Sequence, residues 1–211
     1  MKRRGPWSRA GLLGVGLAFA LLTGGCASAP APEPLVRSYV AQPAGGRLAR
    51  VLLLPARNET ATGAASRVVD RALALELLRR QRFELVQLPP DVDADRFLAT
   101  LRVRGRERTD ALVRLGRSLG VDAVIAPVVM AYDPYDPPLL AVRAVLIGTR
   151  DGRVLWGAEG VFDAREDRVR RAALSFSASG AKRSQHGPEI VLASGQQYAR
   201  FACAQLAATL P

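Results

Sequence analysis

Histidine and cysteine are scarce in this 211-residue sequence, and their scarcity limits the chemistry that the chain can support. The one histidine, His186, stands in a polar stretch, and the two cysteines, Cys26 and Cys203, lie far apart. No group of these residues has the spacing of a metal site. Neither a G-x-S-x-G nucleophile motif nor a phosphate-binding P-loop is present. We therefore expect no metal, no cofactor and no enzymatic activity.

The amino-terminal apolar run, residues 11–22, is too short to span a membrane, because a transmembrane helix needs about 20 apolar residues. It follows a basic start and has the length of the hydrophobic region of a secretory signal. The stretch Leu22-Thr23-Gly24-Gly25 then precedes Cys26 and resembles a bacterial lipobox. The resemblance implies that residues 1–25 are a lipoprotein signal peptide and that Cys26 carries diacylglycerol.

Lipidation of Cys26 would tie the mature protein to a membrane. Ala27 follows the cysteine where an aspartate would signal retention at the inner membrane, so the resemblance implies the periplasmic face of the outer membrane. A plain secretory signal with a chance cysteine, or an uncleaved anchor helix, is the alternative. If Cys26 is lipidated, Cys203 has no disulfide partner. Its spacing places it on the apolar face of a final helix, where it acts as a small hydrophobic residue.

The chain is strongly basic, with a net charge of +11 that comes almost entirely from arginine. The signal peptide carries four of these charges, which leaves +7 on the mature chain. An exported protein meets no nucleic acid to regulate, so we expect no nucleic-acid partner. The arginines are expected to form solvated helix faces, or to face anionic lipid headgroups or an acidic partner.

Hydrophobic spacing predicts one periplasmic α/β domain over residues 49–211, behind an Ala- and Pro-rich tether at residues 26–48. Expected strands lie at 51–54, 83–88, 121–132, 139–150 and 153–162, and expected helices at 64–81, 91–103, 109–119, 165–176 and 194–210. The first two strands should run parallel, and the later hairpins should add antiparallel strands. The predicted fold class is therefore α/β with mixed α+β character, a single mixed β-sheet flanked by helices. Residues 34–40 of the tether are a further candidate strand.

Local signals refine these boundaries. Thr109 is the expected N-cap of its helix, and Gly120 is the expected glycine at the end of that helix. Asp151-Gly152 predicts a two-residue hairpin turn. Ser194 and Gln197 predict a capping box for the last helix.

Residues 50–88, RVLLLPARNETATGAASRVVDRALALELLRRQRFELVQL, carry a family resemblance. With Pro55, Asn58 and Thr60 they resemble the opening of the family shared by the curli-secretion lipoprotein CsgG, the peptidoglycan-synthase activator LpoB and the TolB amino-terminal domain. SLGVDAVIAPVVMAYDPY and LIGTRDGRVLWGAEGVF resemble two later strands of that family, so the resemblance covers residues 48–163. It implies a TolB-amino-terminal-domain-like fold, in which Asn58 stabilises a loop and Trp156 packs on the sheet.

The resemblance also implies a role. We expect a lipid-anchored periplasmic cell-envelope protein that acts as a non-enzymatic assembly or regulatory adaptor through contacts with an unknown envelope protein. One alternative is an oligomeric subunit of a curli-type export complex, which needs membrane-inserting hairpins. Tight turns at 133–138 and 151–152 leave only residues 172–192 long enough for such an insertion. The other alternative is a small-ligand-binding or enzymatic domain.

Two stretches carry candidate partner-binding residues. The first holds Tyr132 and Tyr135 at a proline-stiffened hairpin tip, where rigid aromatic side chains suit a binding surface. The second is an alternating arginine stretch with Arg102, Arg104 and Arg106, which is expected to be a solvated linker or a phosphate- or lipid-facing patch. The sequence does not specify the partner, the oligomeric state, or whether the arginines face lipid or protein.

Overall fold

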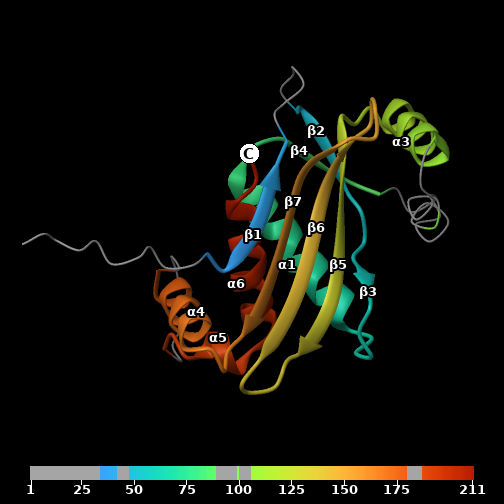
Figure 1. Ribbon diagram of the computed structural model, residues 1–211. Helices are drawn as coiled ribbons and strands as arrows, with labels where there is room; N and C mark the ends of the chain where they lie inside the picture. Colours follow the sequence, from blue (N-terminus) through green and yellow to red (C-terminus); the bar gives the residue numbers. More distant parts are fainter. Residues whose placement is uncertain (1–33, 42–47, 89–98, 100–105, 180–186) are drawn as a thin grey trace, which may run out of the picture. The chain divides into compact units, whose positions relative to one another are not determined.

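A seven-stranded mixed sheet forms the centre of the domain (Figure 1). The computed structural model describes residues 34–41, 48–88, 99, 106–179 and 187–211, and residues 34–211 form one compact unit. The strands are β1 (Val36–Val40), β2 (Arg50–Leu53), β3 (Arg57–Asn58), β4 (Glu84–Gln87), β5 (Ala123–Asp133), β6 (Leu139–Gly148) and β7 (Val154–Asp163). Their order across the sheet is β1-β7-β6-β5-β2-β4, and β3 also pairs with β5.

The strand directions confirm the predicted mixed sheet. β2 runs parallel to both β4 and β5, whereas β5, β6, β7 and β1 are each antiparallel to the next. α1 (Ala65–Arg80) is the crossover between the parallel strands β2 and β4. The continuous apolar run of β2 fits a strand that is buried on both faces.

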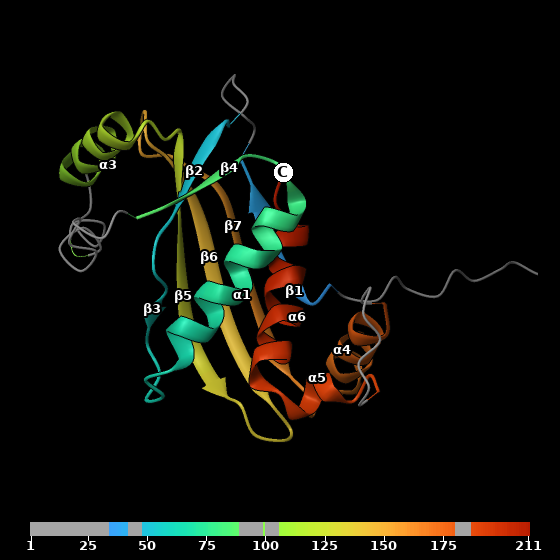
Figure 2. The same ribbon diagram turned by 180° about the vertical axis from the view of Figure 1, so that it is seen from behind.

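Helices cover both faces of this sheet. α1 and α6 (Gly195–Ala208) lie side by side on one face (Figure 2), and their buried side chains join the larger core cluster. α3 (Arg106–Leu119) packs on a smaller cluster with Leu52, Leu54 and Val124, which point away from α1 because neighbouring strand residues face opposite sides. α4 (Asp167–Ser179) and the short α5 (Ile190–Ala193) lie between β7 and α6 in the chain. Within the described residues, no helix is long and apolar enough to cross a membrane.

Several local expectations are confirmed. Gly120 follows α3 with a positive φ of 61°. Of the predicted capping box, the Ser194 half is present, because the Ser194 side chain accepts the Gln197 N–H at the start of α6, whereas Gln197 Oε1 accepts from Arg200 Nη1. Cys203 is fully buried, as expected for a residue on the apolar face of the last helix. The Trp156 indole is also buried, and its Nε1–H donates to the Thr209 carbonyl at 3.0 Å.

The loop before α1 has the predicted asparagine network. The Asn58 carboxamide oxygen accepts the Thr60 N–H at 3.0 Å and the Thr60 hydroxyl at 2.8 Å. Its Nδ2 donates to the Thr62 carbonyl at 2.9 Å. Asn58 therefore satisfies the backbone of its own loop, which leads the chain from β3 into α1.

Two predicted boundaries are wrong. α3 begins at Arg106, so Thr109 lies in its first turn, where its side chain packs against the turn containing Gly152 instead of capping the helix. The predicted two-residue hairpin is a longer turn, residues 149–153, although Gly152 does have a positive φ of 68°. Thr149 leaves the strand because its hydroxyl donates to the Val121 and Asp122 carbonyls at 2.8 and 3.0 Å.

Other differences concern elements that the sequence did not specify. β3 and α5 were not predicted, and both are very short. Residues 34–40 do supply a strand, because β1 pairs with β7 along its whole length. The expected helix at 91–103 falls almost entirely outside the described residues, as do the signal peptide, Cys26 and most of the proposed tether.

Candidate functional site

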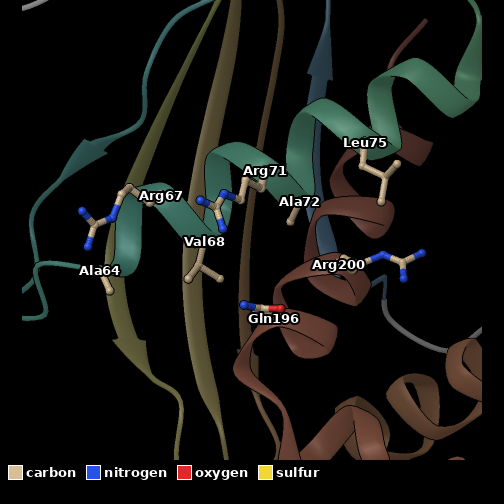
Figure 3. Close-up of a pocket in the computed structure, with 8 residues that line it drawn as sticks. All are labelled: Ala64, Arg67, Val68, Arg71, Ala72, Leu75, Gln196 and Arg200. Carbon is tan, nitrogen blue, oxygen red and sulfur yellow. The ribbon is translucent and has the colours of Figure 1, made fainter. Parts of the chain in front are cut away.

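A pocket of about 410 Å³ lies between α1 and α6. The two helices run in the same direction and diverge toward their amino-terminal ends (Figure 2). The pocket lies between these diverging halves, and its lining residues are Ala64, Arg67, Val68, Arg71, Ala72 and Leu75 from α1 and Gln196 and Arg200 from α6 (Figure 3). We call this pocket the α1–α6 groove.

The spacing along each helix explains why these side chains share one groove. Each α1 residue of the groove lies three or four positions from another one, the spacing that places side chains on one helix face. Gln196 and Arg200 are likewise four residues apart on α6. The opposite face of α1 carries Val69, Leu73 and Leu77, which are buried in the core. The core face therefore fixes the position of the groove face.

Positive charge dominates the groove, because three of its eight lining residues are arginines and none is acidic. Arg67 and Arg71 are exposed. Both helices also direct their amino-terminal ends toward this half of the domain, and a helix amino terminus carries a partial positive charge. The field in the groove consequently favours an anionic ligand.

Arg200 is held in place by a buried carboxylate. Its Nε lies 3.5 Å from Glu76 Oε1, and its Nη1 donates to Gln197 Oε1 at 3.3 Å. Glu76, which is only 6% exposed, also lies 3.5 Å from Arg79 Nη1. Glu76 thus offsets part of the charge of Arg200, and the excess positive charge of the groove comes mainly from Arg67 and Arg71.

Gln196 and four apolar side chains of α1 form the rest of the groove. Val68 and Leu75 point from α1 toward α6 (Figure 3), and Leu75 is 40% exposed. An aliphatic side chain of a ligand could pack on them while a carboxylate meets the arginines. Among the described residues, no group of three His, Cys, Asp or Glu side chains could hold a metal ion. The arrangement therefore suits recognition of an acidic, partly apolar segment.

A second pocket, of about 390 Å³, lies beside α3 and is lined by Val113, Gly116, Arg117, Val121, Asp122, Thr149 and Arg150. Its polar groups are engaged within the fold. Asp122 Oδ2 accepts the backbone N–H groups of Ala49 and Arg50 at 2.8 and 3.1 Å. Thr149 donates its hydroxyl to two carbonyls of the neighbouring chain segment. We therefore interpret this pocket as a structural feature, formed where α3 packs on the sheet.

The two tyrosines that the sequence placed at one hairpin tip differ in their exposure. Tyr135 is 79% exposed in the turn between β5 and β6. Tyr132 is only half-exposed and packs against the core, so its expected place on the exposed hairpin tip is wrong. Tyr132 precedes the turn and lies against Gly195 at the start of α6. Partner binding by either ring stays a prediction.

The lipobox residues Leu22, Thr23, Gly24 and Gly25, the lipidation site Cys26, and Arg102 and Arg104 all lie outside the described residues. Arg106 begins α3, but its side chain is not among those described. The α1–α6 groove was not predicted from the sequence. The only signal for it was the i, i+4 spacing of Arg67 and Arg71, which equally fits a solvated helix face.

No protein-family model and no curated protein matches this sequence. Several solved structures are similar to it. PelC from Paraburkholderia phytofirmans, described as a dodecamer, is 19% identical over 64% of this chain and 86% of its own, with a TM-score of 0.45. The LpoB carboxy-terminal domain from Salmonella enterica is 16% identical over 57% of this chain and 87% of its own, with a TM-score of 0.39. TolB from Acinetobacter baumannii is 14% identical over 68% of this chain and 30% of its own, with a TM-score of 0.34.

LpoB and TolB are two of the proteins that the sequence resembles. The mixed sheet with helices on both faces has the architecture that the sequence predicts. We therefore infer the role of this chain from its own residues.

Proposed function

We propose that this chain is a lipid-anchored periplasmic protein of the bacterial cell envelope, and that it acts as a non-enzymatic adaptor. In this role the α1–α6 groove holds an acidic segment of another envelope protein. One observation carries the proposal: three of the eight residues that line the groove are arginines, contributed by two helices, and none of the eight is acidic.

The chemistry of arginine supports a carboxylate-bearing partner. A guanidinium group can donate two parallel hydrogen bonds to one carboxylate, and such charge-assisted bonds are stronger than neutral ones. Arginine is also one of the residues that contribute most to binding energy at protein interfaces. Arg67 and Arg71 stand one helical turn apart, so they can contact successive acidic groups of an extended segment.

The anchor is a separate part of this proposal, and it rests on the lipobox before Cys26. Acyl chains on Cys26 would hold the domain on the periplasmic face of the outer membrane. Replacing Cys26 with serine should move the protein from the membrane fraction to the soluble fraction or to an uncleaved precursor. Continued retention of a cleaved Cys26→Ser protein in the membrane fraction would show that the cysteine is not the anchor.

Charge reversal in the groove tests the adaptor role. We would extract the full-length protein from its own envelope in mild detergent, identify the co-purified chain, and measure its affinity for the purified protein. Arg67→Glu combined with Arg71→Glu should weaken binding at least tenfold, a change that corresponds to about 1.4 kcal/mol. The matched control is Arg80→Glu combined with Arg82→Glu, because these exposed arginines lie outside the groove and carry the same charge.

Two results would contradict the adaptor role. Equal affinity in the groove variant and the control variant would remove the groove from the interface. A native mass that corresponds to a ring of identical subunits, without a second chain, would favour the export alternative instead. Both variants should keep the wild-type unfolding midpoint, since surface substitutions usually change stability by less than about 0.5 kcal/mol.

A further inference from the structure

One end of the sheet gathers the start of the folded unit and the turn between β5 and β6. Val36, the first residue of β1, pairs with Gly160 near the end of β7. Asp163, the last residue of β7, pairs with Leu139, which pairs in turn with Asp133 of β5. The turn 134–138 therefore projects beyond the sheet end that is nearer to the start of β1, which begins three residues inside that end (Figure 1).

The groove opens in the same half of the domain. A Cβ at Gly195 would lie 2.7 Å from the Tyr132 hydroxyl and 2.9 Å from Pro134 Cβ, so α6 begins against this turn. α1 begins after β3, which runs parallel to β5 toward that end. We call this part of the domain the tethered end; it comprises the start of β1, the turn 134–138 and the amino-terminal ends of α1 and α6.

Pairing of β1 with β7 shortens the link to the proposed anchor. β1 is hydrogen-bonded to β7 along its whole length, and Val36 is buried in the core. If Cys26 carries the lipid, only the segment between Cys26 and Pro34 separates the acyl chains from the folded unit. Eight residue steps span at most about 30 Å even when fully extended, at ~3.6 Å per residue. If β1 were not paired and all of residues 27–48 formed an extended tether at ~3.1 Å per residue, the tether would be roughly 70 Å long.

We infer that the tethered end faces the outer membrane and that the turn carrying Tyr135 lies at the level of the lipid headgroups. This inference rests on the lipid anchor of the proposed function. The other end of the sheet, at the turn 149–153, is about 30 Å farther along β6, since a strand rises ~3.3 Å per residue. Val36 pairs with Gly160, six residues from Val154 at the opposite end of β7, so that end lies about 20 Å from the start of β1 at ~3.3 Å per residue. Contact of that end with the bilayer would require most of the extension of the tether, whereas the Tyr135 turn reaches the bilayer with a less extended chain.

The turn itself suits a headgroup layer. Tyr135 is 79% exposed and stands between Pro134 and Pro137. Tyrosine is enriched at membrane–water interfaces because its ring is apolar and its hydroxyl is polar. Asp133 and Asp136 flank it, and Asp133 Oδ1 accepts the Tyr135 N–H at 3.1 Å. Two carboxylates disfavour the hydrocarbon core and a purely anionic surface, so the fitting contact is a zwitterionic headgroup with an ammonium group, such as phosphatidylethanolamine.

This orientation narrows the class of partner. With the groove in the membrane-facing half of the domain, the acidic segment would come from a protein that is itself held at the same membrane. A partner that reaches the groove from the far side of the periplasm would have to approach around the domain.

A pair of tryptophan variants tests the orientation. The full-length lipidated protein would be reconstituted into phosphatidylethanolamine–phosphatidylglycerol vesicles that contain dansyl-labelled phosphatidylethanolamine. Tyr135→Trp places a donor on the exposed turn at the tethered end, and Arg150→Trp places one on the exposed turn at the opposite end. Trp156 is buried in both and gives the background, which the unsubstituted protein measures.

We expect energy transfer to the dansyl headgroups to be several-fold stronger from Tyr135→Trp than from Arg150→Trp, after subtraction of the background. Equal transfer from the two variants, or stronger transfer from Arg150→Trp, in a protein that floats with the vesicles would overturn the orientation and leave the anchor intact. A protein that does not float would instead overturn the anchor, and the orientation with it. A Tyr135→Trp chain that begins at residue 26 and also carries Cys26→Ser, and therefore has neither signal peptide nor lipid, should show no transfer above background.

Discussion

The two faces of the sheet are built on very different scales. On the α1–α6 side, the Phe201 ring contacts three other aromatic rings. The distances between ring centroids are 5.5 Å to Phe162, 5.8 Å to Phe176 and 5.7 Å to Tyr198. On the α3 side, the described part of the core is a small aliphatic cluster around Leu112. The groove thus lies on the outer surface of the more extensively packed helices. A binding site gains precision when its side chains project from rigid elements, and this placement provides that rigidity.

Removing the central ring of the larger core should have the largest effect. Phe201→Ala is expected to lower the free energy of unfolding by about 3–5 kcal/mol, because it deletes a buried aromatic side chain and leaves a cavity. Leu112→Ala, on the α3 side, should cost less, near the lower limit of the ~2–5 kcal/mol range for leucine, because the smaller cluster can collapse more easily. Chemical denaturation followed by Trp156 fluorescence measures both. A greater loss from Leu112→Ala would reverse the comparison.

A substitution that adds one methyl group should reveal how tightly α3 is joined to the sheet. A Cβ at Gly116 would lie 2.6 Å from Thr149 Cβ and 3.1 Å from the Val121 carbonyl oxygen. We expect Gly116→Ala to destabilise the protein by about 1–3 kcal/mol through overpacking, despite the higher helix propensity of alanine. The same denaturation assay measures the change.

Gly63→Ala is the control for this substitution, since a Cβ there meets nothing within 4 Å. Gly63 precedes α1 on the other face of the sheet. Unchanged stability in Gly116→Ala would mean that α3 can move away from Thr149 at little cost.

The sequence predicts the larger features of both faces, because their signals are local. The alternation of β5 to β7 and the helical spacing of α1 and α6 follow from hydrophobic period, and Gly120 marks a helix end through its backbone freedom. β3 and α5 are too short for a periodic signal. The turn 149–153 depends on hydrogen bonds from Thr149 to residues of a distant segment. Such contacts leave no local pattern.

The groove is unpredictable from sequence for a related reason. Arg71 and Arg200 come from helices far apart in the chain, and they line one groove only because α1 and α6 pack on the same sheet face. In the sequence, Arg67 and Arg71 have the spacing of any solvated helix surface. Tyr132 illustrates the reverse case, because its proline-rich neighbourhood indicated exposure whereas α6 covers part of it.

Thiol labelling should show which face opens more readily. Cys203 lies in the larger core, where burial raises the pKa of its thiol, and only the thiolate reacts with alkylating reagents. We expect iodoacetamide to modify Cys203 in the folded protein far more slowly than a cysteine at the buried position Ala111 of α3, introduced as Ala111→Cys in a Cys203→Ala chain. Mass spectrometry over time gives both rates. Equal rates would indicate that both faces open only by global unfolding.

The smallest expected effect is a dependence of the free energy of unfolding on pH, caused by Asp70 at the edge of the α1–α6 face. Asp70 Oδ1 accepts the Ala56 N–H at 2.7 Å, which joins α1 to the segment between β2 and β3. Burial raises the pKa of the Asp70 carboxyl above its ordinary value of 3.8, and the hydrogen bond from Ala56 lowers it only in part. The folded state therefore binds this proton more tightly than the unfolded state. The contribution of Asp70 to stability falls as the pH rises from below 3.8 through the raised pKa, and is constant above it.

Asp70→Asn isolates this contribution, because an amide oxygen can still accept the Ala56 N–H but carries no charge. The free energy of unfolding of the wild type, minus that of Asp70→Asn, should fall as the pH rises across this window. Denaturation curves of both proteins at a series of pH values measure the difference. A flat difference would mean that folding leaves the pKa of Asp70 unchanged, and a difference that rises with pH would mean that the carboxylate is stabilised in the fold. In that case this edge of α1 would be held by charge as well as by packing.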